Sequence, residues 1–273
     1  MKRGLREIKS YFQMNKPKII FFGNGLLAEC ALAILEKHCE IIFHAREKAD
    51  LEVVKKMKVE HPEAKGVLAS FGVMIKSDVL EIFEPEGILN IHPSLLPKYR
   101  GASPIESAIL AGDTEFSVSV MKLAKAMDAG PVYYQETLRG LPLNKQVIYK
   151  ELAETGAKWI VKNLMDLPEP IAQDEEGVTF TSKLDKTMSW LKPETETAEQ
   201  ILRKIVAYQG FPKPKYAVCG QNCIILEVHI AEVGEIALLP IECQDGAVVA
   251  VDLLQPEGKR PMDAKSFLNG YKR

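Results

Sequence analysis

Hydrophobic residues in the first part of the chain occur in short runs that amphipathic stretches separate. The runs at residues 18–22, 41–43 and 66–69 have the length of buried strands. Between them, residues 26–37 and 51–59 carry apolar side chains at the spacing of a helix. Strands that alternate with helices in this way predict a parallel, doubly wound sheet.

The same alternation continues to about residue 165, so we predict one α/β domain over residues 14–182. Its fold class is expected to be α/β, with a Rossmann-like, mostly parallel sheet and helices on its faces. The further segments predicted within it are helices at 79–83, 104–110 and 147–165, and strands at 87–91 and 117–123.

The hydrophobic pattern changes beyond Trp190. One amphipathic helix is predicted at residues 198–208, and short strands such as 223–228 and 247–253 follow it, with turns between them. A small β-barrel of the OB type fits this pattern. The expected boundaries are a linker at residues 183–196 and a C-terminal OB-like barrel domain at residues 197–273.

Residues 1–13 form a basic segment ahead of a second methionine, Met14, and the first predicted strand begins shortly after it. Two interpretations of this segment stay open. It is either a short helical N-terminal extension or a stretch that precedes the true start of translation.

The composition limits the classes of function. A chain of 273 residues that is 47% hydrophobic can bury one large core and still form a second, smaller domain. Lys and Arg number 35 against 37 Asp and Glu, which gives a formal net charge of -2. A nucleic acid could therefore be bound only by a local basic patch, because the chain as a whole does not attract polyanions.

The cysteines and the hydropathy bear on location. Five cysteines are an odd number and no signal peptide is visible, so we expect reduced thiols and a cytoplasmic protein. Cys219 and Cys223 have no second Cys or His pair at zinc-like spacing, so no metal site is predicted. No apolar run reaches the roughly 18 residues that span a bilayer, so no membrane association is expected.

A glycine turn at residues 23–28 follows the first predicted strand and fits the G-x-G-x-x-A fingerprint of dinucleotide-binding proteins. Arg46 lies near the place where an NADP-dependent enzyme would bind the 2′-phosphate. These features would make the chain an NADP-dependent oxidoreductase. The second strand ends without the acidic residue that contacts the ribose in such enzymes, so this interpretation is the less favoured one.

Three residues form the clearest chemical pattern. Asn90 and His92 stand two apart at the carboxyl end of a predicted strand, where an open parallel sheet exposes its ligand crevice. Asp128 follows in an Asp-Ala-Gly-Pro turn after the next predicted strand. An amide and an imidazolium can stabilise a tetrahedral oxyanion, and a histidine can move a proton near neutral pH.

The runs at residues 90–97, 99–105 and 128–131 resemble the motifs of the folate-dependent formyltransferases and hydrolases. The segments 254–262 and 267–270 resemble the last strands of the barrel in the members that act on initiator methionyl-tRNA. The likeness covers nearly the whole chain. It implies a transferase of one-carbon metabolism that moves a formyl group from 10-formyltetrahydrofolate to the methionine of initiator tRNA, for the initiation of protein biosynthesis.

The resemblance also implies roles for individual residues. Asn90, His92 and Asp128 would be catalytic, with Asp128 orienting the His92 ring, and no metal would be needed. The residues implied to bind the folate donor are Ser94, Leu95, Leu96 and Pro97 in the loop after the strand, and Ser70, Phe71 and Gly72 beside the pterin pocket.

The expected macromolecular partner is initiator methionyl-tRNA, and we expect the chain to act as a monomer. Residues 45–65 are shorter than the matching stretch of the tRNA-specific family members, which usually carry a basic loop there. Formyl transfer to an amino-sugar nucleotide therefore stays open, as does a non-catalytic role in binding folate or RNA. The candidate phosphate contacts are Lys98, Arg100, Lys213, Lys215, Lys259 and Arg260.

Overall fold

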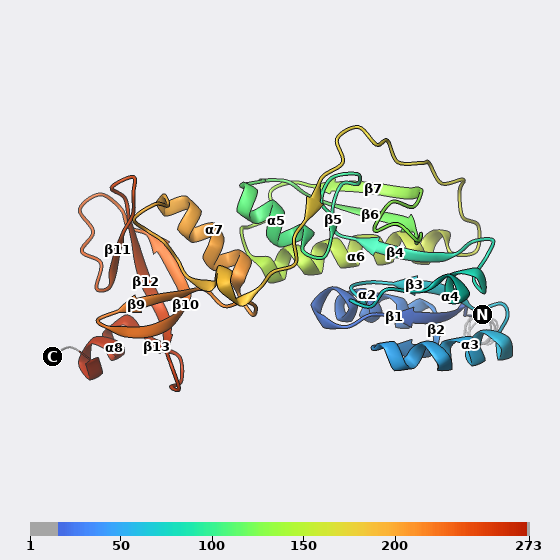
Figure 1. Ribbon diagram of the computed structural model, residues 1–273, viewed down its shortest axis with the longest axis horizontal. Coiled ribbons are helices and arrows are strands. Elements are labelled where there is room, and N and C mark those ends of the chain that lie inside the picture. The colour runs from blue at the N-terminus through green and yellow to red at the C-terminus, as the bar shows by residue number, and fades with distance from the viewer. Residues whose placement is uncertain (1–15, 272–273) are drawn as a thin grey trace, which may run out of the picture. The chain divides into compact units, whose positions relative to one another are not determined.

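The computed structural model describes residues 16–271, and the expected extension at residues 1–13 lies outside them. The chain divides into two compact units (Figure 1). The α/β unit contains the chain up to Pro104, together with Glu115–Pro142 and Gln146–Thr181; the C-terminal unit contains Ile105–Thr114, Leu143–Lys145 and the chain from Ser182 onward. The domain boundaries proposed from the sequence stay predictions.

A six-stranded sheet forms the centre of the α/β unit, in the order β2-β1-β3-β4-β6-β7. The first four strands in this order are parallel, and β6 and β7 are antiparallel to their neighbours. The parallel-rich, Rossmann-like sheet is confirmed. The strands are β1 (Lys18–Phe22), β2 (Glu40–Ala45), β3 (Lys65–Leu68), β4 (Ile88–His92), β6 (Phe116–Lys122) and β7 (Val132–Leu138).

Strands β6 and β7 are the antiparallel members of this mostly parallel sheet. Parallel neighbours need a crossover that returns the chain to the same end of the sheet. The helix between β4 and β6, α5 (Pro104–Ala111), instead groups almost wholly with the C-terminal unit. The chain therefore re-enters the sheet at the carboxyl end of β4, where Ser119 of β6 lies opposite His92.

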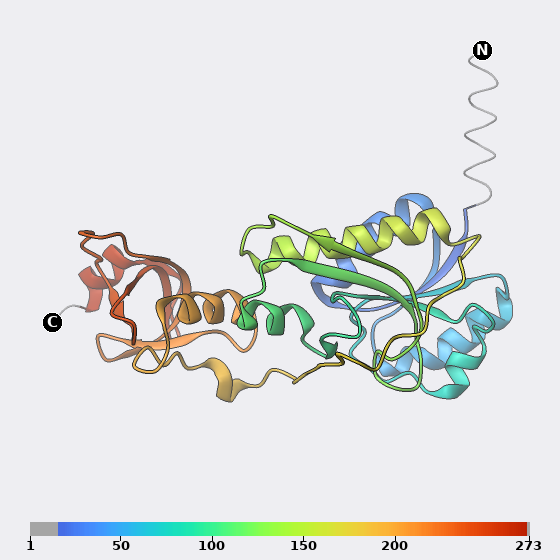
Figure 2. The ribbon, with the colours of Figure 1, turned by 90° about the horizontal axis from the view of Figure 1, so that it is seen from above.

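Helices cover both faces of this sheet, with α2 and α6 on one side and α3 and α4 on the other (Figure 2). Because both faces are covered, Ile19, Ile20, Phe21 and Phe22 of β1 are all fully buried, which explains the unbroken apolar run in the sequence. The helical elements are α2 (Gly25–His38), η1 (Lys48–Asp50), α3 (Leu51–Glu60), α4 (Ser77–Glu81) and α6 (Lys145–Asn163).

The chain after α6 forms an extended segment, residues 171–181, that we call the strap. Ile171 forms a β-bridge with Val132 at the start of β7. The strap ends in β8 (Phe180–Thr181), which pairs in parallel with β5 (Arg100–Gly101). It is drawn in yellow in Figure 1 and was not predicted from the sequence. The strap thus pairs with both β7 and β5 of the α/β unit.

The C-terminal unit is an antiparallel sheet, β11-β12-β10-β9, with β13 paired to β12. This curled half-barrel confirms the expected OB-like fold. Helix α7 (Ala198–Tyr208) begins at a capping box formed by Thr197 and Gln200. It buries Ile201 and Ile205 in a core shared with Phe267. The other elements are η2 (Lys186–Ser189), β9 (Lys215–Val218), β10 (Gln221–Ile230), β11 (Pro240–Glu242), β12 (Val248–Pro256), β13 (Met262–Asp263) and α8 (Ala264–Tyr271).

A charged cluster on this unit predicts a pH dependence. His229 Nδ1 lies 2.8 Å from Asp252 Oδ2, and its Nε2 lies 2.7 Å from Glu235 Oε1. Asp252 first, and then Glu235, raise the pKa of His229 from 6.5 to about 9. Since the folded state binds this proton more tightly, the stabilisation is complete below pH 6.5 and is lost as pH rises through about 9.

We expect an NMR titration of the His229 ring to have its midpoint well above 6.5, and Asp252→Asn to lower it. Glu235 anchors the loop 231–239. As pH rises through about 9, hydrogen exchange of the amides in this loop should become faster relative to those in β10, once both are corrected for the intrinsic exchange rate. A midpoint close to 6.5 in the unaltered protein would contradict the ion pairs.

Within the described residues, no helix combines the length and the apolar character needed to cross a membrane.

Candidate active site

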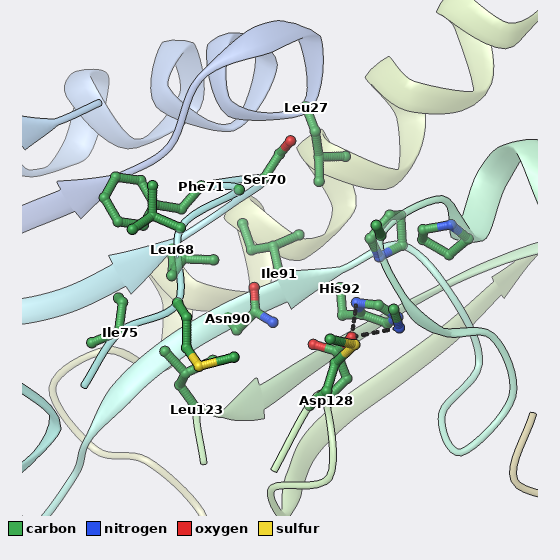
Figure 3. A pocket seen from close by; sticks show the side chains of 18 of the residues that line it. Leu27, Leu68, Ser70, Phe71, Ile75, Asn90, Ile91, His92, Leu123 and Asp128 are labelled. Atoms are coloured by element: carbon green, nitrogen blue, oxygen red, sulfur yellow. Dashed lines mark hydrogen bonds and ion pairs between the residues drawn. The ribbon is translucent and has the colours of Figure 1, made fainter. Parts of the chain in front are cut away.

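A cavity of about 450 Å³ opens at the carboxyl ends of β3 and β4 (Figure 3). Its volume lies in the range of small-molecule sites. Ser70, Phe71 and Gly72, which follow β3, line it together with Asn90 and His92 of β4. Much of the remaining wall is apolar and includes Leu27, Ile75, Ile91, Leu123 and Met127. The cavity therefore combines an apolar body with a few polar groups at one edge.

Asn90 and His92 are the polar residues of an otherwise apolar buried strand, and each is only 5% exposed. Their two-residue spacing places them on the same face of β4, and both side chains reach the cavity (Figure 3). Ile91, between them, contacts the other layer: a Cβ added to Gly156 of α6 would lie 2.8 Å from its side chain. Packing on that face thus fixes the direction in which the two polar side chains point.

The hydrogen bonds of His92 decide which of its nitrogens carries a proton. Nε2 lies 3.1 Å from the carbonyl oxygen of Tyr99, which can only accept, so Nε2 is the donor. Nδ1 faces Asp128 Oδ2 at 3.7 Å, a distance too long for a direct hydrogen bond. Proton exchange is therefore left to Nδ1, beside a carboxylate.

Asp128 sits in a turn that the surrounding backbone holds tightly. Its φ of 48° is in the left-handed region, which aspartate tolerates better than most residues. Its Oδ2 accepts a hydrogen bond of 2.7 Å from the backbone N–H of Gly101. Two residues on, a Cβ on Gly130 would lie 1.9 Å from the Lys122 carbonyl oxygen, so the turn packs directly against the end of β6. The carboxylate is thus fixed by the fold before any ligand binds.

The loop at Ser94–Pro97 does not line the cavity. Ser94 is buried and its hydroxyl donates to the Lys98 carbonyl oxygen. Two residues that we did not predict hold this loop: Ser119 donates to the Ser94 carbonyl oxygen, and Gln135 donates to that of Leu96. Ser70, Phe71 and Gly72 line the cavity, whereas Ser94, Leu95, Leu96 and Pro97 do not. Folate contact by all seven residues stays a prediction.

Arg100 requires a correction. The sequence made it a candidate phosphate contact, but the residue is 3% exposed. Its Nε and Nη2 donate to Gln173 Oε1 at 3.1 and 2.8 Å, and Nη2 also lies 3.2 Å from Glu175. The guanidinium is therefore an internal anchor for the strap and is not presented to an RNA backbone.

The remaining candidate phosphate contacts lie at the surface. Lys98 is exposed on the α/β unit, in the loop between β4 and β5. On the C-terminal unit, Lys213, Lys259 and Arg260 are exposed and Lys215 is half-buried. Their contact with RNA stays a prediction.

The glycine turn at residues 23–28 serves packing. A Cβ on Gly23 would lie 2.1 Å from the Ala69 carbonyl oxygen, so the glycine allows the turn to approach β3 closely. The N–H groups of Gly23 and Asn24 donate to the carbonyl oxygens of Ala45 and Ser70, at 2.9 and 3.1 Å. A pyrophosphate would need such donors to be free, so the geometry does not favour NADP binding.

Across residues 16–271, no cluster of three or more His, Cys, Asp or Glu side chains could hold a metal ion. The polar groups that remain at the cavity include an amide, an imidazole and a carboxylate. They are suited to stabilising an oxyanion and moving a proton.

Comparisons with known proteins agree with this chemistry. Residues 13–164 match the formyl transferase family, and residues 183–272 match the formyl transferase C-terminal domain. A methionyl-tRNA formyltransferase of Jannaschia sp. (strain CCS1) is 37% identical over 75% of this chain and 69% of the relative. That of Paracoccus denitrificans (strain Pd 1222) is 34% identical over 84% and 82%.

Solved structures share the fold at lower identity. A methionyl-tRNA formyltransferase from Clostridium thermocellum superposes with a TM-score of 0.64 at 18% identity, covering 87% of this chain and 99% of that one. HypX from Aquifex aeolicus in complex with tetrahydrofolic acid gives a TM-score of 0.73 at 16% identity, covering 94% and 47%. From the family match and the sequence relatives together, the chain belongs to the formyl transferase family and, within it, groups with the methionyl-tRNA formyltransferases.

Proposed function

We propose that this protein transfers a formyl group from 10-formyltetrahydrofolate to the amino group of methionine on initiator tRNA, for translation initiation in the cytoplasm. The observation that carries the proposal is the meeting of Asn90, His92 and Asp128 at one cavity. The identity with tRNA-specific relatives supports the acceptor. The monomeric state expected from the sequence stays a prediction.

The cavity suits a reduced folate. Apolar side chains such as Leu27, Phe71 and Ile75 can contact a flat ring system, and the volume of about 450 Å³ is large enough for a ring system of that size. Asn90 and His92 then mark the edge at which the formyl group would be placed. Ser70, Phe71 and Gly72 would border the ring.

The reaction forms one C–N bond and breaks another. The methionine nitrogen attacks the formyl carbon, and the oxygen of the tetrahedral species takes on negative charge. The Asn90 amide, directed into the cavity, donates a hydrogen bond to that oxygen (Figure 3). Because β4 is buried along its whole length, this donor needs no rearrangement when the charge develops.

The same step requires that a proton leave the amine and reach the departing folate nitrogen. His92 Nδ1 and Asp128 Oδ2 face one another at 3.7 Å, close enough to share the proton through a reacting nitrogen or a water. Nδ1 takes up the proton beside the Asp128 carboxylate and then returns it to the leaving group. The proton that the amine loses is the one that the folate nitrogen gains, so the reaction needs no further reactant.

Acceptor identity is tested by direct assay. Formyl transfer from 10-formyltetrahydrofolate is measured with methionyl initiator tRNA, uncharged initiator tRNA and an amino-sugar nucleotide. We expect rapid transfer to the charged tRNA alone. Transfer to the sugar nucleotide and none to the tRNA would support the proposed formyl transfer but would contradict methionyl-tRNA as the acceptor.

Salt dependence tests the proposed RNA contacts. The KM for methionyl-tRNA should rise steeply with salt, because bound phosphates release counterions. Lys213→Ala should reduce the slope of log KM against log salt by about 1 if Lys213 contacts one phosphate. Lys150→Ala is the control, because Lys150 on α6 is paired with Glu151 and Glu154. A salt-independent KM would remove the electrostatic contacts from the proposal.

A further inference from the structure

We infer that Gln173, in the strap, is a positioning residue that holds the Asp128 turn in its reactive geometry; the inference rests on the proposed function. Gln173 lies outside the three catalytic residues and the motifs that contain them. Its side-chain amide joins three groups: the guanidinium of Arg100 and the carbonyl oxygens of Asp128 and Gly130. It is the point at which the strap meets the active site.

The geometry leaves the amide one orientation. Oε1 accepts from Arg100 Nε and Nη2, at 3.1 and 2.8 Å. Nε2 donates to the Asp128 and Gly130 carbonyl oxygens, each at 2.7 Å. The reversed amide would set donors against donors and acceptors against acceptors. A glutamine can satisfy all four bonds, whereas its isostere glutamate can accept from Arg100 but cannot donate to the carbonyls.

These bonds act where the backbone is strained. Asp128 has a φ of 48°, a conformation that persists only where the surroundings hold it. Gln173 bonds the carbonyl groups of Asp128 itself and of Gly130, on either side of Ala129. The side chain of Asp128 is thereby directed at His92.

The strap also places the group that bonds Asp128. Its Thr179 accepts from the N–H of Tyr99 through the hydroxyl, at 2.7 Å, and from that of Arg100 through the carbonyl, at 2.8 Å. The next N–H in the chain belongs to Gly101 and donates to Asp128 Oδ2. The strap therefore positions both the carboxylate, through Gln173, and the backbone segment that supplies its donor.

The decisive variant is Gln173→Glu. It keeps the bond to Arg100 but removes both donors and sets a carboxylate against two carbonyl oxygens. We expect kcat to fall about tenfold or more, up to the roughly hundredfold that a displacement of about 1 Å can cause, with little change in the KM for the folate donor. Gln173→Ala, which adds no charge, should act in the same direction. Asp174→Asn, at the exposed neighbouring position, should leave kcat unchanged.

A double-variant cycle separates positioning from general destabilisation. If Gln173 acts through Asp128, Gln173→Glu should lower kcat little further once Asp128 is replaced by asparagine. Independent effects that multiply would overturn the inference, as would a kcat within about twofold of the unaltered protein for both Gln173 variants.

An activity-independent measurement distinguishes this inference from the proposed function. Hydrogen exchange followed by mass spectrometry should show faster exchange in the peptide that carries the Gly101 amide in Gln173→Glu than in Asp174→Asn. If the unaltered enzyme formylates no acceptor, the proposed function fails and the exchange data still decide the role of Gln173. Equal exchange in the two variants would overturn that role.

Discussion

Replacing His92 by glutamine is expected to lower kcat for formyl transfer about a thousandfold, within the range of roughly 10² to 10⁴ that a positioned acid or base contributes. Glutamine can place its Nε2 near the position of the ring Nε2 and still donate to the Tyr99 carbonyl oxygen, so the loop that Tyr99 belongs to should remain in place. What is lost is Nδ1, the nitrogen that faces Asp128 and exchanges the proton. The measurement is single-turnover transfer at saturating donor and acceptor.

His44 supplies a matched control for this variant. Its Nε2 also meets a backbone carbonyl oxygen, that of Gly23, at 2.8 Å, and it also lies near the carboxyl end of a parallel strand. It does not line the cavity. His44→Gln should therefore retain nearly full activity, and equal losses in the two variants would show that His92 serves the fold and not the reaction.

The buried strands of the α/β unit were predictable because helices cover them on both sides. Strand β1 is an unbroken apolar run for that reason. Strand β7 gave no such signal: it lies at the edge of the sheet, and its residues are half-buried or exposed without a regular alternation. An edge strand is specified largely by the neighbour it pairs with, which a local pattern does not contain.

The meeting of Asn90 and His92 could be inferred because they stand two apart at the carboxyl end of a parallel strand. Asp128 follows β6, which runs antiparallel to β4, so the loop after β6 brings Asp128 back to His92 and strand-end convergence does not account for it. The geometry of the contact between His92 and Asp128 could not be inferred from the sequence. Asp128 was expected to orient the His92 ring, and its carboxylate bonds the Gly101 N–H and stands 3.7 Å from Nδ1 of that ring. That distance depends on how two loops and the strap pack, and none of these has a periodic pattern.

Arg100 shows why a basic residue beside a motif is ambiguous. An arginine side chain suits both a phosphate contact and an internal anchor, so the sequence alone does not distinguish the two roles. The choice depends on Gln173, which is distant in the sequence and belongs to a segment without regular structure before β8. Ser119 and Gln135 were missed for the same reason, because a polar residue in a strand is specified by the loop it contacts.

Asp128→Asn is expected to lower kcat by about 10² to 10³ while leaving the thermal unfolding temperature nearly unchanged. The side-chain oxygen of asparagine can still accept from the Gly101 N–H, so the turn keeps its main anchor. The carboxylate that faces His92 Nδ1 is replaced by a neutral amide, which cannot take part in moving the proton.

Asp128→Ala separates the two roles of the carboxylate. It removes the charge and also leaves the Gly101 N–H without its acceptor, a change that costs about 1 to 3 kcal/mol when the donor is shielded from water. Both variants should lose activity, but alanine alone should lower the unfolding temperature. If asparagine retained most of the activity and alanine did not, the carboxylate would be an anchor for the turn and the proton would have to pass through His92 alone.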